Sequence, residues 1–319
     1  MRIVVALGGN ALLRRGEALT AENQRRNMRQ VAPALARIAA DHTLIVVHGN
    51  GPQVGLLALE GEAYADAPPM PLDMLGAESQ GMIGYVIQQE LRRTTPTLSC
   101  VTVLTQTVVA ANDPAFANPT KPIGPVYDAA EAKRLAEERG WQVAPDGDGF
   151  RRVVGSPIPQ RIVELEAVRQ LVAAGTVPIC AGGGGVPVIE GNTGLAGVEA
   201  VVDKDLAASL LAMLLGADRL IILTDVAGVF ADWGTPEQRL LRQIDAETCD
   251  PTQFAAGSMA PKLSAACGFA RATGKAATIA ALSALDEAIA GTAGTTILSE
   301  SLADSSIGWA RSSGFGQRN

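Results

Sequence analysis

The chain has 319 residues, of which 47% are hydrophobic and 18% charged, and its formal net charge is −7. This length suits one large α/β domain or two lobes, and the composition excludes a disordered protein. Acidic and basic residues are interspersed, so we expect no nucleic acid partner and no anionic membrane surface. The apolar runs have the length of strands and no charged leader precedes an apolar segment, which predicts a cytoplasmic protein without a membrane span.

The cysteines and histidines form no pattern typical of a metal site or a disulfide framework. Histidine occurs only at positions 42 and 48, and no C-x-x-C motif is present among the four cysteines, Cys100, Cys180, Cys249 and Cys267. Widely spaced cysteines of this kind are usually buried free thiols. We therefore expect neither zinc nor disulfide bonds.

Short apolar strands alternate with longer helices along most of the chain. The hydrophobic pattern predicts strands at 2–7, 43–47, 98–104, 177–180, 219–223 and 276–280. It predicts helices at 20–40, 53–63, 74–93, 129–140, 159–174 and 204–216, from 258 onward, and at about 283–290. This alternation indicates the α/β class, with an open, mostly parallel sheet sandwiched by helices.

The alternation is interrupted between residues 112 and 158. The run NDPAFANPTKPIGP at 112–125 contains four prolines, and a polar helix and two short β-like pieces follow it. We predict that 112–158 is a small subdomain protruding from a main domain of residues 1–298. Residues 230–239 are expected to be a loop, and 299–319 a C-terminal tail of unassigned role.

Three of the predicted strands end in glycine clusters. Gly8 and Gly9 follow the first strand, Gly49 and Gly51 follow the second, and four consecutive glycines at 182–185 follow the strand at 177–180. In an open parallel sheet, ligands bind outside the carboxyl ends of the strands, so the three turns can converge on one anion site. Flexible loops are the alternative interpretation of each cluster taken singly.

Two common glycine motifs do not fit these positions. The segment from Gly268 to Ala276 has one residue too many for a Walker P-loop and lacks the hydroxyl that binds magnesium. The turn from Gly49 to Gly55 has one extra residue relative to the dinucleotide fingerprint, and no strand with a terminal acid follows at the expected distance. A nicotinamide dehydrogenase is therefore disfavoured.

Three lysines could supply the cations of a phosphate site. Lys204 and Lys262 lie at the starts of predicted helices, and Lys121 lies between two prolines of the protruding segment. Phosphoryl transfer needs mainly positioning and positive charge on the transferring oxygens. Each lysine could instead be solvated. Asp205 and Asp225 could orient lysines, hold magnesium through water, or cap helices and turns.

The segments that carry these residues resemble the carbamate kinases of the amino acid kinase superfamily. The resemblance covers nearly the whole chain to about residue 297, in the order ALGGNAL, HGNGPQVG, GAESQGMIGY, DPAFANPTKPIGP, FRRVVGSP, GGGGVPV, GVEAVVDKDLA, LTDV and AGSMAPK. The segment around NPTKPIGP separates carbamate kinases from the sister kinases of acetylglutamate, aspartate, glutamate and uridylate. Gly155 and Ala227 depart from the family pattern, which usually has a proline and often an acidic residue there.

The resemblance implies an αβα sandwich, a homodimer, and Mg²⁺-dependent exchange of a phosphoryl group between ATP and carbamate. In fermenting cells this reaction usually runs from ADP and carbamoyl phosphate toward ATP. By motif position, Lys204 and Lys262 would neutralise the phosphoryl oxygens, Asp205 would orient lysines, and Lys121 would reach carbamoyl phosphate. The resemblance assigns no side chain as a metal ligand.

Two further groups of residues follow from the same resemblance. Those implied to bind carbamoyl phosphate and the transferring group are Gly8, Gly9, Asn10, Gly49, Asn50 and Gly51. Those implied to lie near the nucleotide are Gly183, Gly184, Thr224, Asp225, Val226, Phe230 and Met259.

Two other functions are compatible with this sequence. A kinase of another small carboxylate or of a carbamate derivative would use ATP with a different acceptor. A non-catalytic nucleotide or anion sensor would bind ADP without turnover, but it would have no need of three lysines that stabilise a transition state.

Overall fold

The computed structural model describes residues 1–14, 16–64, 66, 68–255 and 258–299, with only the backbone at Asn10. Its centre is an eight-stranded sheet in the order β15-β17-β16-β12-β1-β2-β9-β3. All neighbouring pairs are parallel except β16 and β17, so the expected mostly parallel sheet is confirmed. The strands are β1 (Arg2–Leu7), β2 (Thr43–His48), β3 (Cys100–Thr102), β9 (Val177–Ile179), β12 (Arg219–Thr224), β15 (Gln243–Asp245), β16 (Ala277–Ala281) and β17 (Thr295–Leu298).

Helices cover both faces of this sheet, as the αβα prediction requires. One layer consists of α1 (Ala21–Asp41), α3 (Leu72–Thr94) and α8 (Leu285–Ala290), and the other of α5 (Leu165–Ala173), α6 (Lys204–Leu214) and α7 (Met259–Thr273). Successive side chains of a strand point to opposite faces. In β1, Ile3 and Val5 therefore pack in the first layer, and Val4 and Ala6 pack in the second. Within the described residues, no helix combines the length and hydropathy needed to span a membrane.

A smaller four-stranded sheet lies beside the main one. Its order is β11-β10-β4-β8, and its strands are β4 (Gln106–Val109), β8 (Pro159–Ile162), β10 (Val186–Gly191) and β11 (Gly194–Gly197). The predicted helix at 159–174 is wrong at its start, because residues 159–162 pair with β4 and the helix begins only at Leu165. The hairpin of β10 and β11 follows the glycine run directly and was not predicted.

Two other expectations need correction near the C-terminus. The expected loop at 230–239 has a strand at each end, because β13 (Val229–Ala231) pairs with β14 (Arg239–Leu241). The predicted strands did not include residues 295–298, which form β17 beside β16. Residues 300–319 of the predicted tail lie outside the described residues. The four cysteines are free, as predicted, but Cys249 is only partly buried.

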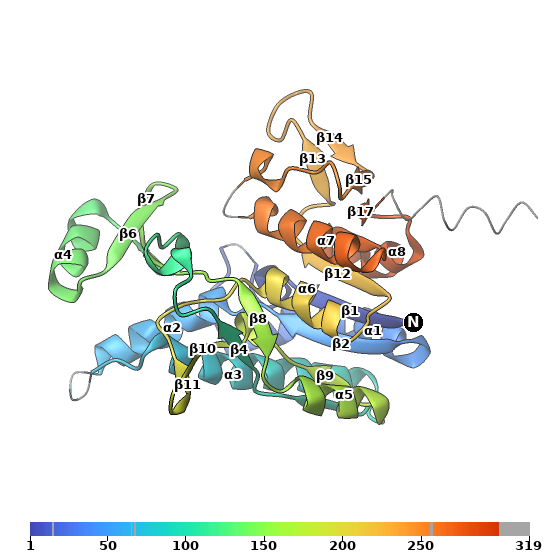
Figure 1. Ribbon diagram of the computed structural model, residues 1–319, viewed down its shortest axis with the longest axis horizontal. Helices are drawn as coiled ribbons and strands as arrows, with labels where there is room; N and C mark the ends of the chain where they lie inside the picture. The colour runs from blue at the N-terminus through green and yellow to red at the C-terminus, as the bar shows by residue number, and fades with distance from the viewer. Residues whose placement is uncertain (15, 65, 67, 256–257, 300–319) are drawn as a thin grey trace, which may run out of the picture.

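Residues 121–154 form a separate antiparallel sheet that projects from the body (Figure 1). The sheet has the order β5-β7-β6, with β5 (Lys121–Tyr127), β6 (Gln142–Asp146), β7 (Gly149–Val154) and helix α4 (Ala129–Arg139). We call residues 112–158 the excursion; its status as a subdomain stays a prediction. It contacts the body through α2 (Gly51–Ala63), where a Cβ on Gly55 would lie 3.1 Å from the Gly124 Cα.

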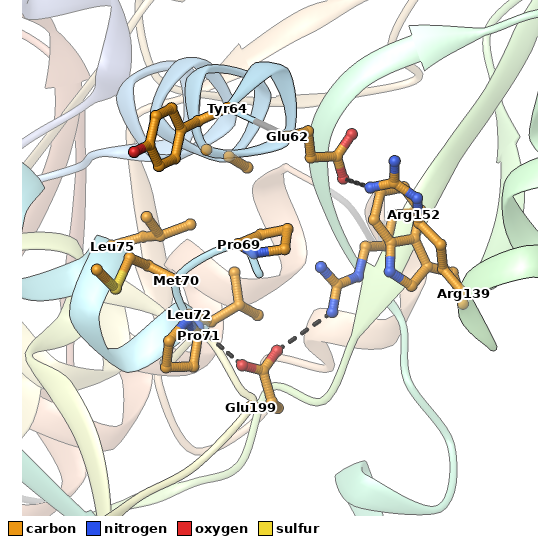
Figure 2. Close-up of a pocket in the computed structure, with 13 residues that line it drawn as sticks. Glu62, Tyr64, Pro69, Met70, Pro71, Leu72, Leu75, Arg139, Arg152 and Glu199 are labelled. Carbon is orange, nitrogen blue, oxygen red and sulfur yellow. Dashed lines mark hydrogen bonds and ion pairs between the residues drawn. The ribbon is translucent and has the colours of Figure 1, made fainter. Parts of the chain in front are cut away.

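Ion pairs also join the excursion to the body around a pocket of ≈ 490 Å³ (Figure 2). Arg139 of α4 pairs with Glu62 of α2, and Arg152 of β7 pairs with Glu199 at 3.2 Å. The Trp141 ring contacts both guanidinium groups, whose carbons lie 5.1 and 4.7 Å from its centroid. Such cation–π contacts orient the two arginines toward the carboxylates of the body.

Candidate active site

The glycine turns after β1, β2 and β9 open on one pocket of ≈ 230 Å³. The lining includes Gly9, Gly49, Asn50, Gly51 and Gly183 from these turns, and Lys121, Lys204 and Lys262 from three other parts of the chain. We call this the lysine pocket. Because parallel strands end at the same edge of the sheet, residues far apart in the sequence meet there.

The turns fit together only because they contain glycine at the points of contact. A Cβ on Gly49 would lie 3.2 Å from the Lys204 Cδ and 3.5 Å from the Gly9 backbone nitrogen. Gly183 has a φ of +64°, and a Cβ there would lie 2.1 Å from the Asn50 Nδ2. A larger residue at either position would displace a side chain of the pocket or strain the backbone.

Asp205 holds the two lysines that come from helices. It is the second residue of α6 and is buried, with 3% of its side chain exposed. One carboxylate oxygen pairs with Lys204, and the other lies 3.2 Å from the Lys262 Nζ at the start of α7. A buried carboxylate between two ammonium groups is compensated, and one net positive charge remains for an anionic ligand.

Lys121 reaches the same pocket from the excursion. Its Nζ lies 2.7 Å from the Asp203 Oδ2. The other Asp203 oxygen caps α6 by accepting hydrogen bonds from the backbone N–H groups of Asp205 and Leu206. Burial raises the pKa of Asp203, but the charges of Lys121 and Lys204 and these hydrogen bonds outweigh burial and lower it to about 2.

Burial lowers the pKa of both ionisable side chains beside Gly49. Burial lowers the pKa of Lys204, and the charge of Lys262 lowers it further, while Asp205 opposes both effects. Burial also lowers the pKa of His48 to about 4, so its imidazole is neutral at pH 7. His48 therefore contributes a packed, uncharged ring against the Gly182 turn, where a Cβ would lie 2.4 Å from its Nε2.

The residues expected near the nucleotide do not share the lysine pocket, Gly183 excepted. Thr224 and Asp225 line a separate pocket of ≈ 470 Å³ at the ends of β12 and β16. Phe230 lies in β13 with its ring 5.2 Å from that of Trp233. The other residues predicted for the site that do not line the lysine pocket are Gly8, Gly184, Val226 and Met259. Of Asn10 the structure describes only the backbone, in the turn 9–11.

Sequence reasoning missed two polar residues that hold the pocket together. Asp203 was assigned no role, and its pairing with Lys121 was not foreseen. Ser79 of α3 accepts a hydrogen bond of 2.9 Å from the Asn50 side chain, although 29 residues separate the two. The motif DKD was a signal for the first, because two acids flank the lysine. No local pattern marked the second.

The carboxylates of the lysine pocket are already neutralised. Asp203 and Asp205 each pair with lysine, and no cluster of three histidine, cysteine or acidic residues suited to a metal occurs in the described part of the chain. Divalent magnesium prefers oxygen ligands and keeps several waters. The pocket therefore fits a metal that arrives with phosphate oxygens better than one held by side chains alone.

The model of the amino acid kinase family matches residues 1–281, and the chain belongs to this family. The carbamate kinase of Haemophilus influenzae is 54% identical over 299 residues, which cover 93% of this chain and 96% of that protein. The carbamate kinase of Rhizobium meliloti is 51% identical and covers 95% of each chain. A structure of the carbamate kinase from Giardia lamblia bound to AMP-PNP has a TM-score of 0.85 and 41% identity, covering 93% of this chain and 98% of that one. Within the family, the chain belongs with the carbamate kinases.

Proposed function

We propose that the protein transfers a phosphoryl group reversibly between ATP and carbamate, giving ADP and carbamoyl phosphate. The observation that carries this proposal is the lysine pocket, where Asp205 bridges Lys204 and Lys262 beneath the glycine turns. In-line phosphoryl transfer needs a rigid array of positive charge around the transferring oxygens and little covalent chemistry from protein. Two lysines fixed by one buried carboxylate provide such an array.

In this proposal the glycine turns and the lysines divide the reacting groups between them. The turns at 8–10 and 49–51 bind carbamoyl phosphate, since the start of α2 presents backbone N–H groups to an anion. Lys204 and Lys262 neutralise the phosphoryl oxygens in the transition state, and Asp205 orients both. Lys121 neutralises the carbamoyl phosphate side from the excursion.

We propose that the nucleotide lies over the C-terminal half of the sheet. Met259 and Lys262 lie about one turn apart on α7, and this spacing supports a nucleotide near Met259 with its phosphates toward Lys262. The remaining members of this proposed site are Gly183, Gly184, Thr224, Asp225, Val226 and Phe230. Kinases of this kind generally use Mg²⁺, which would neutralise phosphate charge. In this proposal Mg²⁺ enters the lysine pocket bound to the phosphate oxygens of the nucleotide. Asp203 and Asp205 stay paired with the lysines and do not bind the metal.

The first experiment measures ATP formation by the purified protein from ADP, Mg²⁺ and carbamoyl phosphate. Spontaneous breakdown of carbamoyl phosphate is subtracted with a protein-free sample. We expect rapid ATP formation that stops when Mg²⁺ is removed with a chelator. A folded protein that binds ADP but forms no ATP would overturn the proposal. Such a result would favour a nucleotide sensor or a kinase of another acyl phosphate.

We also propose that the protein is a cytoplasmic homodimer. Two exposed apolar side chains, Tyr85 of α3 and Leu104 after β3, line one shallow pocket together with Gly81. Exposed apolar side chains beside a small residue of a helix suit a symmetric contact between two copies. Sedimentation should give a dimer for the native chain and a monomer for Tyr85→Arg. A native chain that sediments as a monomer would contradict this part of the proposal.

A further inference from the structure

Asn50 occupies the N-cap position of α2 but does not cap the helix. An asparagine at this position usually accepts a hydrogen bond from a backbone N–H of the first turn through its side-chain oxygen. No such bond is formed here. Asn50 is 7% exposed and lines the lysine pocket, and its Nδ2 donates a hydrogen bond of 2.9 Å to the Ser79 Oγ instead.

Ser79 determines which end of the Asn50 amide faces it. The Ser79 hydroxyl donates its only proton to the carbonyl oxygen of Gly76, at 2.7 Å. Its oxygen can therefore only accept a second hydrogen bond, and only the amide nitrogen of Asn50 can donate one. Ser79 is fully buried, so water does not offer the amide an alternative partner there. The orientation of the amide thus follows from the hydrogen-bond network.

The amide oxygen of Asn50 is left available to a ligand. It accepts no hydrogen bond from any described residue, and Gly183 packs against the amide where a Cβ would lie 2.6 Å from this oxygen. The two carboxylates that line the lysine pocket, Asp203 and Asp205, are taken by lysines. Among the described side chains of the pocket, Asn50 therefore presents a buried acceptor beside several cations and N–H donors.

We propose that the Asn50 Oδ1 accepts a hydrogen bond from the amino group of the substrate, and that Ser79 is a positioning residue that fixes this orientation. The inference rests on the proposed function. A carbamoyl group differs from an acetyl group in having an N–H donor in place of a methyl group. Cations and backbone N–H groups can bind the oxygens of both, but only an acceptor distinguishes the amino group. A reversed amide would set an N–H donor against another donor.

Acetyl phosphate provides the comparison that tests the proposal. The measurement is kcat/KM for ATP formation from carbamoyl phosphate and from acetyl phosphate, with the native chain and with Ser79→Ala. We expect the variant to lose roughly tenfold with carbamoyl phosphate, the size of one neutral hydrogen bond, and to change little with acetyl phosphate. Ser209→Ala is the matched control, because Ser209 is a buried helical serine that donates to the Ala265 carbonyl outside the lysine pocket.

A double substitution shows whether Ser79 acts through Asn50. If it does, Ser79→Ala should have no further effect on the preference for carbamoyl phosphate in an Asn50→Ala background. Equal losses of kcat/KM with both acyl phosphates in Ser79→Ala, or no loss with either, would overturn the inference. These results leave the proposed function intact, because that function fails only when the native chain forms no ATP from carbamoyl phosphate.

Discussion

The helices of the body and the excursion supply the cations of the lysine pocket in different ways. Lys204 and Lys262 come from α6 and α7, which pack on the main sheet, and a single buried carboxylate holds both. Lys121 comes from β5 and pairs with one carboxylate, that of Asp203. The rest of the excursion is joined to the body by ion pairs around the pocket of ≈ 490 Å³ that Trp141 lines (Figure 2). The comparison indicates that two charges are fixed with the fold, whereas the third depends on how the excursion docks.

The largest expected effect is that of removing a lysine held by Asp205. Replacing Lys204 or Lys262 with alanine should lower kcat by roughly 10²–10³, because a preorganised charge at the transferring oxygens is lost. The melting temperature should change little by comparison. Lys275→Ala is a suitable control, because Lys275 pairs with Asp218 at 2.9 Å outside the lysine pocket. Near-normal turnover in both pocket variants would eliminate the proposed mechanism.

The excursion lysine should have a smaller effect that falls on a different parameter. Lys121→Ala should raise KM for carbamoyl phosphate by roughly tenfold, since an interaction with a partly exposed charge is screened by water. The KM for ADP should stay nearly the same, because the nucleotide is proposed to lie over the other half of the sheet. Steady-state kinetics with each substrate varied in turn gives both values. An equal rise in both KM values would argue against this division.

Breaking a docking contact of the excursion should have a smaller effect again. Arg152→Gln removes the 3.2 Å pair with Glu199 and should raise KM for carbamoyl phosphate a few-fold, roughly the value of a part-exposed ion pair. The effect should disappear when Lys121 is already alanine, because the docking matters through that lysine. Arg134→Gln is the control, since Arg134 pairs only within α4 on the exposed side of the excursion. Additive effects of the Arg152 and Lys121 substitutions would refute this link.

The ion pair of Asp203 should make the stability of the fold depend on pH in acid. The pKa of Asp203 is lowered from 3.8 to about 2 in the folded protein, so its ion pair stabilises the fold above about pH 4. This contribution, on the order of 2 kcal/mol, should be lost as the pH falls from about 4 to about 2. Asp203→Asn keeps an oxygen for the cap of α6 but removes the charge. Denaturant unfolding should show the variant less stable at pH 7 and equal to the native chain near pH 2. A difference independent of pH would contradict the assignment.

The sequence predicted the layers of the fold better than the edges of its sheets. The apolar runs at 2–7 and 219–223 are buried on both faces, and such runs identify central parallel strands. Residues 159–162 were assigned to a helix, because the hydrophobic pattern does not mark the boundary between a short strand and a helix that follows it directly. Residues 186–197 form a hairpin whose second strand, GLAG, is fully exposed and begins and ends with glycine, so it shows no alternating hydrophobic pattern.

For the site, sequence patterns identified the turns and lysines but not the contacts between them. Glycine after a strand and lysine at a helix start are local features, which a single sequence displays. The bond from Asn50 to Ser79 and the pair of Lys121 with Asp203 depend on how distant segments dock. The excursion shows the same limit. Its helix α4 was predicted, but the pocket between Trp141 and the body was not.

The route of the chain into and out of the excursion has a consequence for how this protein could be altered. The excursion begins after β4 and ends at β8, and these strands are antiparallel neighbours in which Val109 faces Pro159. Residues facing each other across such a ladder are about 5 Å apart, so a tight turn could reconnect them. The part that carries Lys121 therefore leaves the fold after one strand and returns at the neighbouring strand. Exchanging it offers a way to change acceptor preference while the sheet and the Asp205 pair are kept.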